Sequence, residues 1–366
     1  MKSKLQVTKH VLGVYFRCHT LTIVKLVTKE KYLMFENKTF LITGGTGSFG
    51  KALATTLLIK HPEVAKVIIF SRDELKQYEM QESEPFRENE KVRFFIGDVR
   101  DLDRLMEAFE NVDFIVHAAA LKQVPAAEYN PLECIKTNIL GTQNVITAAK
   151  AQNVEALVSL STDKASSPAN LYGATKLCAD KLVVASNFNK GTKDYKAAVV
   201  RYGNVINSRG SVIPKFEKLA STGLLPVTDP SMTRFSISLE QGVDLVIWAS
   251  QNLIGGEIFV PRLPSYRITD LARAICQDCE IEIVGIRPGE KNHEEMISNS
   301  DARNTIELSD KYVIVPEHNK RLYGKHLAKY GANFVDSQFV YSSGDNDSFL
   351  TVSELRNQLE SWTQRG

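Results

Sequence analysis

Cysteine is scarce in this sequence, which has five cysteines among 366 residues. An odd number of widely spread cysteines excludes the dense disulfide framework of a small secreted domain. Cys276 and Cys279 form a C-x-x-C pair, but no second pair and no suitably spaced histidines follow to complete a zinc site. The pair also lies late in an expected helix, which is a poor position for a thioredoxin-type redox motif. We therefore expect reduced structural cysteines, no metal site and a cytoplasmic location.

Net charge is also small, at +2 for the whole chain, which argues against a dedicated nucleic-acid-binding protein. The charge is unevenly distributed, because residues 1–34 hold seven lysines and arginines against one acid, Glu30. The remainder of the chain is therefore mildly acidic, behind a basic leader.

A long uninterrupted apolar run is missing from this leader as well. Arg17, His19 and Lys25 interrupt its most apolar stretch, which excludes both a signal peptide and a membrane-spanning helix. We expect no membrane insertion, and a surface-lying amphipathic segment is the alternative. Met34 begins the segment Met34–Lys38, which directly precedes the first core strand, so residues 1–34 are interpreted as a disordered extension or the product of an upstream start.

Internal repeats and low-complexity tracts are absent, and the pattern from Thr39 onward alternates strands with helices. Strand-length apolar runs separated by helical patterns predict an α/β fold, a Rossmann-type doubly wound parallel sheet covered on both faces. The expected strands are Thr39–Thr43, Lys66–Phe70, Val92–Ile96, Phe114–Val116, Ala156–Ser161, Ala197–Arg201 and Glu257–Val260.

The rhythm changes after Arg201, where glycine, proline and serine become frequent up to Pro230. Such a composition is typical of loops over a ligand. We therefore expect a cofactor-binding Rossmann domain over 35–203, completed by about 232–260. The segments 204–231 and 261–366 are expected to form a smaller, mainly C-terminal substrate-binding region.

A glycine-rich turn follows the first strand, with the sequence Thr43-Gly44-Gly45-Thr46-Gly47-Ser48-Phe49-Gly50. It satisfies G-x-G-x-x-G between a strand and a helix, the context in which such glycines let a pyrophosphate approach a helix N-terminus. The turn therefore predicts a dinucleotide site, to which we assign Gly44, Thr46, Gly47, Ser48, Phe49 and Gly50.

The end of the second strand indicates which dinucleotide binds. An NAD enzyme usually has an acid there for the ribose hydroxyls, whereas this strand ends in Ser71 and Arg72. Arginine forms forked contacts with phosphate, and Lys76 adds charge, so the pattern favours NADP. Asp73 keeps NAD open as the alternative. Asp98, at the end of the third strand, is well placed for the adenine amino group.

A second motif, Tyr172-x-x-x-Lys176, follows at the length of a Rossmann domain. Residues four apart share one helix face, so Lys176 is expected to hold the cofactor ribose and to lower the pKa of Tyr172 by its charge. Thr162, Asp163 and Lys164 follow the fifth strand, at the sheet edge where ligands bind. Thr162 can polarise a substrate hydroxyl, and the other two add an acid and an amine.

Together these motifs resemble the extended short-chain dehydrogenase/reductase family, and within it the UDP-N-acetylglucosamine 4,6-dehydratases. The resemblance covers about residues 35–366 and is strongest to the C5-inverting enzymes that begin pseudaminic acid synthesis. The motifs that carry it are Thr43–Gly50, Ser71–Gln77, Phe95–Asp101, His117–Pro125, Glu128–Asn138, Ser161–Ala165, Tyr172–Lys176, Arg201–Val205, Met232–Phe235 and Gly285–Lys291.

The resemblance implies that tightly bound, recycled NADP oxidises sugar C4 while Tyr172 takes the hydroxyl proton. Lys164 is then the base at C5 and Asp163 the acid for the departing 6-hydroxyl. The product is UDP-2-acetamido-2,6-dideoxy-β-L-arabino-hex-4-ulose plus water. Val99 and Ala118, Ala119 and Ala120 are implied as further cofactor contacts.

The UDP-sugar end is expected to involve Lys122, Asn204, Arg209, Arg287, Glu290 and Tyr341. The family also implies a homo-oligomer, a dimer or a hexamer. Because contact between Asp163 and Lys164 would keep each of them charged, we expect them to flank the sugar on opposite sides rather than to pair.

Three alternatives stay open at this point. A UDP-sugar 4-epimerase needs Tyr172 and the cofactor but no base for C5, so Asp163 and Lys164 favour dehydration. A C5-retaining dehydratase differs only in the face of protonation, which residue chemistry does not determine. An NADP-sensing protein without chemistry has no need of the Tyr172–Lys176 pair.

Overall fold

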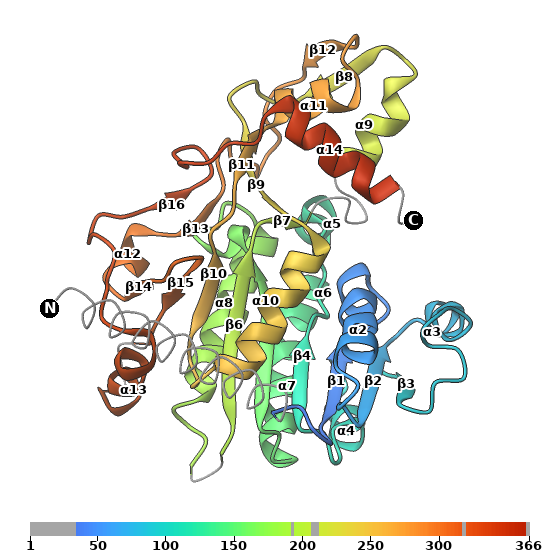
Figure 1. The fold of residues 1–366 in the computed structure, drawn as a ribbon, viewed down its shortest axis with the longest axis vertical. Coiled ribbons are helices and arrows are strands. Elements are labelled where there is room, and N and C mark those ends of the chain that lie inside the picture. Colours follow the sequence, from blue (N-terminus) through green and yellow to red (C-terminus); the bar gives the residue numbers. More distant parts are fainter. Residues whose placement is uncertain (1–33, 192–193, 206–211, 317–319, 364–366) are drawn as a thin grey trace, which may run out of the picture.

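A computed structural model describes residues 34–191, 194–205, 212–316 and 320–363. A nine-stranded sheet forms its centre, in the order β14-β15-β10-β6-β5-β4-β1-β2-β3 (Figure 1). Neighbouring strands among β3, β2, β1, β4, β5, β6 and β10 are parallel. At the other edge, β15 pairs antiparallel with β10, and β14 pairs antiparallel with β15. Their bounds are β1 Thr39–Thr43, β2 Lys66–Ser71, β3 Val92–Ile96, β4 Phe114–His117, β5 Ala156–Thr162, β6 Lys196–Tyr202, β10 Ile258–Pro261, β14 Thr305–Glu307 and β15 Lys311–Ile314.

This topology confirms the expected doubly wound α/β fold. The central strands are buried along both faces, as in Phe40, Leu41 and Ile42 of β1, because helices cover each side of a parallel sheet. Each expected strand is present, and its ends differ by at most one residue. The register puts Thr43 of β1 beside His117 of β4, so the strands end together at one edge of the sheet.

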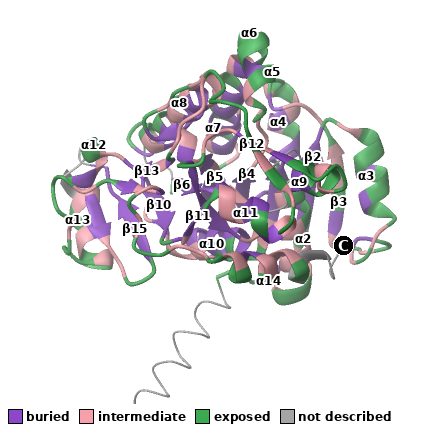
Figure 2. Ribbon diagram, turned by 90° about the horizontal axis from the view of Figure 1, so that it is seen from above, coloured by how far each residue is buried: buried purple, intermediate pink, exposed green. Residues whose placement is uncertain are grey.

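Two groups of helices cover the sheet (Figure 2). On one side α2 (Ser48–Lys60) packs against α10 (Leu239–Asn252), and on the other α4 (Leu102–Ala108), α7 (Gly141–Ala151) and α8 (Leu171–Ser186) pack in a row. Between and beyond them lie α3 (Glu74–Gln81), α5 (Val124–Tyr129), α6 (Pro131–Ile135), the π-helical turn η1 (Lys136–Leu140), the 3-10 turn η2 (Asp163–Ala165) and α13 (Lys320–Tyr330).

A smaller lobe with its own core lies beyond the carboxyl ends of the strands. It contains α9 (Val212–Ala220), β8 (Leu224–Val227), β11 (Ser265–Arg267), α11 (Ile268–Ile275), β12 (Glu280–Ile283) and α14 (Val352–Thr363). Its apolar core includes Phe216, Leu225 and Leu355. Outside the nine-stranded sheet, β11 pairs with β9 (Thr233–Ile237), β9 pairs with β7 (Asn204–Val205), and β13 (Glu295–Ile297) pairs with β16 (Tyr341–Ser342). The short helix α12 (Asn299–Ala302) follows β13.

The cysteine pair differs from the expectation of reduced thiols, because Cys276 and Cys279 are joined in a disulfide. Helix α11 ends at Ile275, so Cys276 caps it and the following turn brings the two sulfurs together. Cys134 and Cys178 are free, and Cys18 lies outside the described residues. Among the residues described, no helix is both long and apolar enough to cross a bilayer. The leader of residues 1–33 lies outside the described part.

Candidate active site

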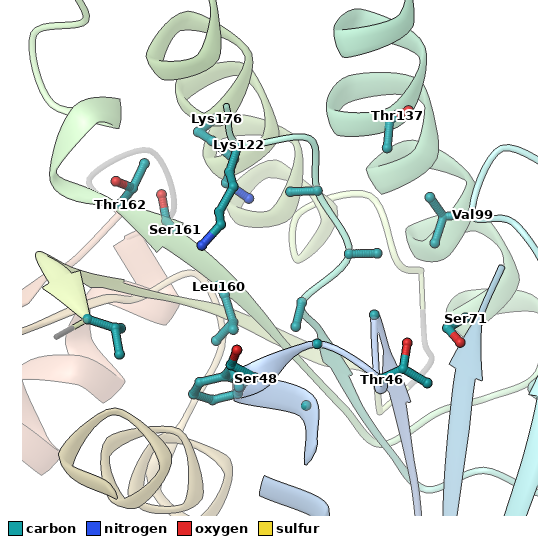
Figure 3. A pocket seen from close by; sticks show the side chains of 18 of the residues that line it. Thr46, Ser48, Ser71, Val99, Lys122, Thr137, Leu160, Ser161, Thr162 and Lys176 are labelled. Carbon is teal, nitrogen blue, oxygen red and sulfur yellow. The ribbon is translucent and has the colours of Figure 1, made fainter. Parts of the chain in front are cut away.

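A cavity of about 920 Å³ opens along the carboxyl ends of the parallel strands (Figure 3). Every expected cofactor residue lines it, from Gly44 in the glycine turn to Lys176 on α8. Figure 3 shows Thr46, Ser71 and Val99 at one end of the view and Ser161, Thr162, Lys122 and Lys176 gathered at the other. The cavity therefore connects the glycine turn to the expected chemical groups.

Glycine is required at two positions of the turn. Gly44 has φ +67°, and a Cβ there would lie 2.9 Å from the Ala119 backbone nitrogen. A Cβ on Gly50 would lie 2.6 Å from the Gly45 Cα. Gly47 caps α2 without any side-chain hydrogen bond, and the first turn of α2 carries no acid. Free N–H groups and an uncompensated helix dipole therefore face this end of the cavity, which fits a pyrophosphate.

The adjacent wall carries Ser71, Arg72, Asp73 and Lys76, the residues from which the sequence predicts NADP in place of NAD. Asp73 caps α3 by accepting from the Lys76 backbone nitrogen at 3.0 Å, and the Lys76 ammonium contacts it at 2.5 Å. These hydrogen bonds lower the pKa of Asp73. Arg72 is about half exposed, and its guanidinium lies 3.5 Å from Asp98. Asp73 is thus engaged within α3, while Arg72 presents its charge to the cavity.

Asp98 is held by Arg100 rather than left free. The Arg100 side chain donates to it at 2.9 and 2.7 Å, and the Arg100 backbone nitrogen donates at 3.0 Å. These bonds and the charge of Arg72 lower the pKa of Asp98 against the opposing effect of partial burial. The carboxylate is therefore fixed in position on the cavity wall.

A buried histidine, His117, contacts Thr43 at the start of the glycine turn. His117 Nδ1 lies 2.8 Å from the Thr43 hydroxyl, and His117 Nε2 lies 3.0 Å from the Thr142 hydroxyl. Thr142 donates to the Asn138 carbonyl at 2.7 Å, so its oxygen accepts from Nε2 and leaves Nδ1 to accept from Thr43. Burial lowers the pKa of His117 to about 3, and the charge of Lys176 adds to this. The imidazole is therefore neutral.

At the end of β5, Asp163 and Lys164 are in direct contact. The Lys164 ammonium lies 3.1 Å from Asp163 Oδ1, which makes the expectation that they lie on opposite sides wrong. The physical reason is local: β5 ends at Thr162, whose hydroxyl caps η2, so the two residues follow a 3-10 turn instead of an extended strand. Asp163 is fully buried and does not line the cavity, whereas Thr162 and Lys164 do.

Tyr172 and Lys176 lie one turn apart on α8 and both line the cavity. Burial raises the pKa of Tyr172 to about 12, and Asp163 adds to this, while Lys164 and the Thr162 hydroxyl act in the opposite direction. The neighbouring cation that lowers this pKa is thus Lys164 and not, as expected, Lys176. Burial also lowers the pKa of Lys176, against the charge of Asp180.

The residues expected at the substrate end are dispersed. Lys122 and Asn204 line the cavity, and Arg209 lies outside the described residues. Arg287 is largely exposed and is paired with Glu290 in its own turn, apart from the cavity. Tyr341 is a core residue whose hydroxyl exchanges hydrogen bonds of 2.7 and 3.0 Å with the Leu263 backbone, so the geometry gives no support for substrate contact.

Other residues of the site were missed by sequence reasoning. Ser161 and Tyr202 are at strand ends, a position from which they could have been inferred. Glu294, beside Lys164, and Arg234, beside Glu294, have no local signal because they come from distant segments. The remaining wall residues outside the expected set are Phe70, Gly97, Gln123, Thr137, Leu160, Gly203, Val205 and Leu239. No cluster suited to a metal ion occurs in the described part of the chain.

The fold and the paired Tyr172 and Lys176 define a Rossmann-type protein of the short-chain dehydrogenase/reductase class. The sequence profile of the polysaccharide biosynthesis proteins matches residues 40–316, and the chain belongs to this family. The expected resemblance to the UDP-N-acetylglucosamine 4,6-dehydratases is confirmed. A protein of that name (inverting) from Campylobacter jejuni is 50% identical over 329 residues, 88% of this chain and 97% of the relative.

Other relatives carry a different name. A UDP-glucose 4-epimerase of Rickettsia conorii is 42% identical over 334 residues, 89% of this chain and 96% of the relative. Among solved structures, Pen from Bacillus thuringiensis is 37% identical with a TM-score of 0.81, covering 90% of this chain and 99% of its own. The dTDP-glucose 4,6-dehydratase DesIV from Streptomyces venezuelae, at 19% identity and a TM-score of 0.64 over 89% and 97% of the chains, shares the fold.

Proposed function

We propose that the chain is an inverting UDP-N-acetylglucosamine 4,6-dehydratase that uses NADP. The observation that carries the proposal is the amine of Lys164 in the same cavity as Tyr172 and Lys176. A 4-epimerase needs the tyrosine and the lysine of α8 but no base at C5. The extra acid and amine of Asp163 and Lys164 fit the additional proton transfers that dehydration requires.

The cavity wall fits a nicotinamide dinucleotide, which would accept hydride from sugar C4 and return it at C6. The open N-terminus of α2 would hold the pyrophosphate, and Lys176 would hold the ribose next to the nicotinamide. Arg72 and Lys76 would bind a 2′-phosphate, because a guanidinium forms forked hydrogen bonds with phosphate. The engagement of Asp73 within α3 supports NADP over NAD.

The remaining steps are proton transfers by residues of this chain. Tyr172 takes the proton of the C4 hydroxyl as a phenolate. Because burial raises the pKa of Tyr172 to about 12, the phenol must first lose its own proton, a loss that the charge of Lys164 and the Thr162 hydroxyl favour. Lys164 removes the C5 proton, and a proton is added back at C5 once hydride has returned at C6. The family resemblance assigns Asp163 as the acid for the departing 6-hydroxyl, although in this structure Asp163 contacts Lys164 and does not line the cavity. Burial raises the pKa of Asp163, which suits an acid. The carboxylates around Lys164 raise its pKa, so that group begins as an ammonium and must lose a proton before it acts.

Three finer assignments rest on the family resemblance and belong to the same proposal. They are the first step of pseudaminic acid synthesis, a cytoplasmic location, and a homo-oligomer, either a dimer or a hexamer. Lys122 and Asn204 are the proposed substrate contacts that line the cavity, with Arg209, Arg287, Glu290 and Tyr341 as further candidates that do not line it in the described structure.

Proton NMR of the purified protein with UDP-N-acetylglucosamine in D₂O, without added cofactor, tests the function. We expect a 4-keto-6-deoxy sugar with deuterium at C5, because the C5 proton is exchanged through the base, and couplings that report inversion. UDP-N-acetylgalactosamine without deuterium would instead establish a UDP-sugar 4-epimerase activity.

Tyr172→Phe provides the matched variant for this experiment. Removing the hydroxyl is expected to lower turnover by about 10²- to 10⁴-fold, the usual contribution of a general acid–base group. Tyr129→Phe is the control, because Tyr129 is 87% exposed on α5. Equal turnover of the Tyr172 variant and the wild type would contradict the assignment of Tyr172.

A further inference from the structure

Lys164 is held by residues from three separate parts of the chain. Its ammonium lies 3.1 Å from Asp163 Oδ1, 2.9 Å from Glu294 Oε1 and 3.3 Å from Asn204 Oδ1. Glu294 is the shortest of these contacts and comes from the segment immediately before β13. Glu294 is only 3% exposed and does not line the cavity, so it contacts the amine from the protein interior and not from the cavity.

Glu294 is itself held firmly by neighbouring strands. Its backbone nitrogen donates to the Ser343 hydroxyl at 2.9 Å, and the Ser343 backbone nitrogen donates to its carbonyl at 2.8 Å. Arg234 of β9 lies 3.8 Å from the same carboxylate oxygen. Within the described residues, the second carboxylate oxygen is buried and has no hydrogen-bond partner. Burying a carboxylate costs free energy of desolvation, so a buried carboxylate whose backbone is fixed and whose oxygen contacts one amine indicates a specific role.

We propose that Glu294 is a positioning residue that holds the Lys164 amine in place at the substrate end of the cavity. Its effect on turnover rests on the proposed function, whereas its hold on the amine does not. Glu294 belongs to neither the glycine turn nor the Tyr172–Lys176 motif. It acts through Lys164, because Lys164 is the group of the pair that reaches the cavity.

The charges around Lys164 determine the direction of the expected effect. Facing it are the carboxylates of Asp163 and Glu294, the guanidinium of Arg234 and the phenols of Tyr172 and Tyr266. The two carboxylates favour the ammonium and outweigh Arg234 and burial, so the pKa of Lys164 is raised. Glu294→Gln removes one negative charge at the shortest contact. The amine is then expected to lose its proton at lower pH, by about one to three pH units.

The first measurement follows the amine itself and needs no turnover. Trace acetylation of the whole protein across pH, with mass spectrometry of the Lys164 peptide, gives the titration of this amine. Its side chain is 23% exposed and is therefore within reach of the reagent. Glu294→Gln is expected to move the midpoint to lower pH, and Glu294→Asp, which keeps the charge, to leave it close to the wild type.

Glu295→Gln is the matched control, one residue away. The Glu295 carboxylate accepts from the Ser166 and Ser167 hydroxyls at 3.0 and 2.6 Å, and in the described chain it forms no ion pair with Lys164. It removes the same charge from the adjacent position without touching Lys164, so it should leave the Lys164 midpoint unchanged. Thermal unfolding of each variant checks that the fold is retained.

The second measurement is the pH profile of dehydration. Glu294→Gln should move the rising limb of kcat to lower pH together with the amine midpoint. At its own optimum kcat should fall about 10- to 100-fold, because the base is less well placed, with little change in KM. A merely structural role would lower activity at every pH without moving the limb.

The outcomes separate the two proposals. An unchanged Lys164 midpoint in Glu294→Gln overturns the inference, as does a shift of equal size in Glu295→Gln. A shifted midpoint with an unmoved kinetic limb overturns the role in turnover. A wild-type protein that does not dehydrate UDP-N-acetylglucosamine contradicts the proposed function, and the amine titration still decides whether Glu294 holds Lys164.

Discussion

Arg72 and Asp73 are neighbours in sequence, but only the Arg72 side chain is available to bind a cofactor. The Asp73 carboxylate is committed to the first turn of α3, through the backbone nitrogen and ammonium of Lys76. Arg72 is 53% exposed and its single ion pair in the described chain, with Asp98, is long at 3.5 Å. A carboxylate that already caps a helix is a poor acceptor for a ribose hydroxyl, and a loosely paired guanidinium is a good partner for a phosphate. The proposed preference for NADP therefore rests on single side chains.

Arg72→Ala tests this choice. Losing a charge-assisted contact of about 1.5–3 kcal/mol should weaken NADP binding by about 10- to 150-fold while NAD binding changes little. Titration calorimetry with each dinucleotide measures both affinities. Arg87→Ala is the control, because Arg87 contacts the Glu82 carbonyl away from the cavity. Equal weakening of NADP and NAD by the Arg72 variant would show that Arg72 does not read the 2′-phosphate.

At the scale of elements, the turn between β1 and α2 determines the shape of the dinucleotide end. Gly50 lies in the first turn of α2 and packs directly on the backbone of Gly44 and Gly45. This close approach lets α2 begin directly after β1, with its free N–H groups at the cavity. A side chain at Gly50 would have to displace the backbone of Gly44 and Gly45, which is less able to move than a flexible side chain.

Gly50→Ala is therefore expected to destabilise the fold by about 1–3 kcal/mol and to weaken dinucleotide binding. Gly324→Ala is the matched control: Gly324 lies within α13, and a Cβ there has no neighbour within 4 Å. Alanine at that position should stabilise the protein by about 0.5–1 kcal/mol. Urea unfolding and dinucleotide titration of both variants provide the measurements, and a Gly50 variant that behaves like the Gly324 variant would refute the packing argument.

At the scale of the whole molecule, buried polar groups tie the sheet to the elements around it. His117 joins the ends of β1 and β4 to α7 through Thr43 and Thr142. Arg201 of β6 pairs with Asp180 of α8 at 3.3 Å and donates to the Met296 carbonyl at 2.8 Å, which links the sheet to β13. Both groups are buried, and the protonation of His117 is coupled to the stability of the entire fold.

His117 gives that coupling a definite sign. Its folded-state pKa of about 3 lies below the ordinary value of 6.5, so the neutral imidazole stabilises the fold above pH 6.5. This contribution is lost as the pH falls from 6.5 toward 3, and amounts to about 2 kcal/mol of lost stability at pH 5.

Urea unfolding at pH 7 and pH 5 measures this contribution in the wild type and in His117→Gln. The variant is expected to be less stable at pH 7, because two buried hydrogen bonds are altered, but to lose about 2 kcal/mol less on acidification. An identical loss in the two proteins would assign the acid sensitivity to other groups.

Much of this protein was determined by local sequence rules. The strands follow runs of apolar residues buried on both faces, and the glycine turn needs contacts only within a few residues and the next strand. The spacing of Tyr172 and Lys176 places them on one face of α8 because helix geometry is periodic. These features depend on neighbours in sequence, which is why they could be inferred before the structure.

Tertiary structure decided what depends on neighbours in space. Glu294 reaches Lys164 only because β13 packs against η2, and the capping of η2 by Thr162 brings Asp163 to the same amine. Tertiary packing also buries Tyr341 in the core and leaves Arg287 exposed at the surface. Sequence spacing specifies which groups share an element, whereas burial and charge at the active site depend on how separate elements meet, and that sets which of these groups carry a proton.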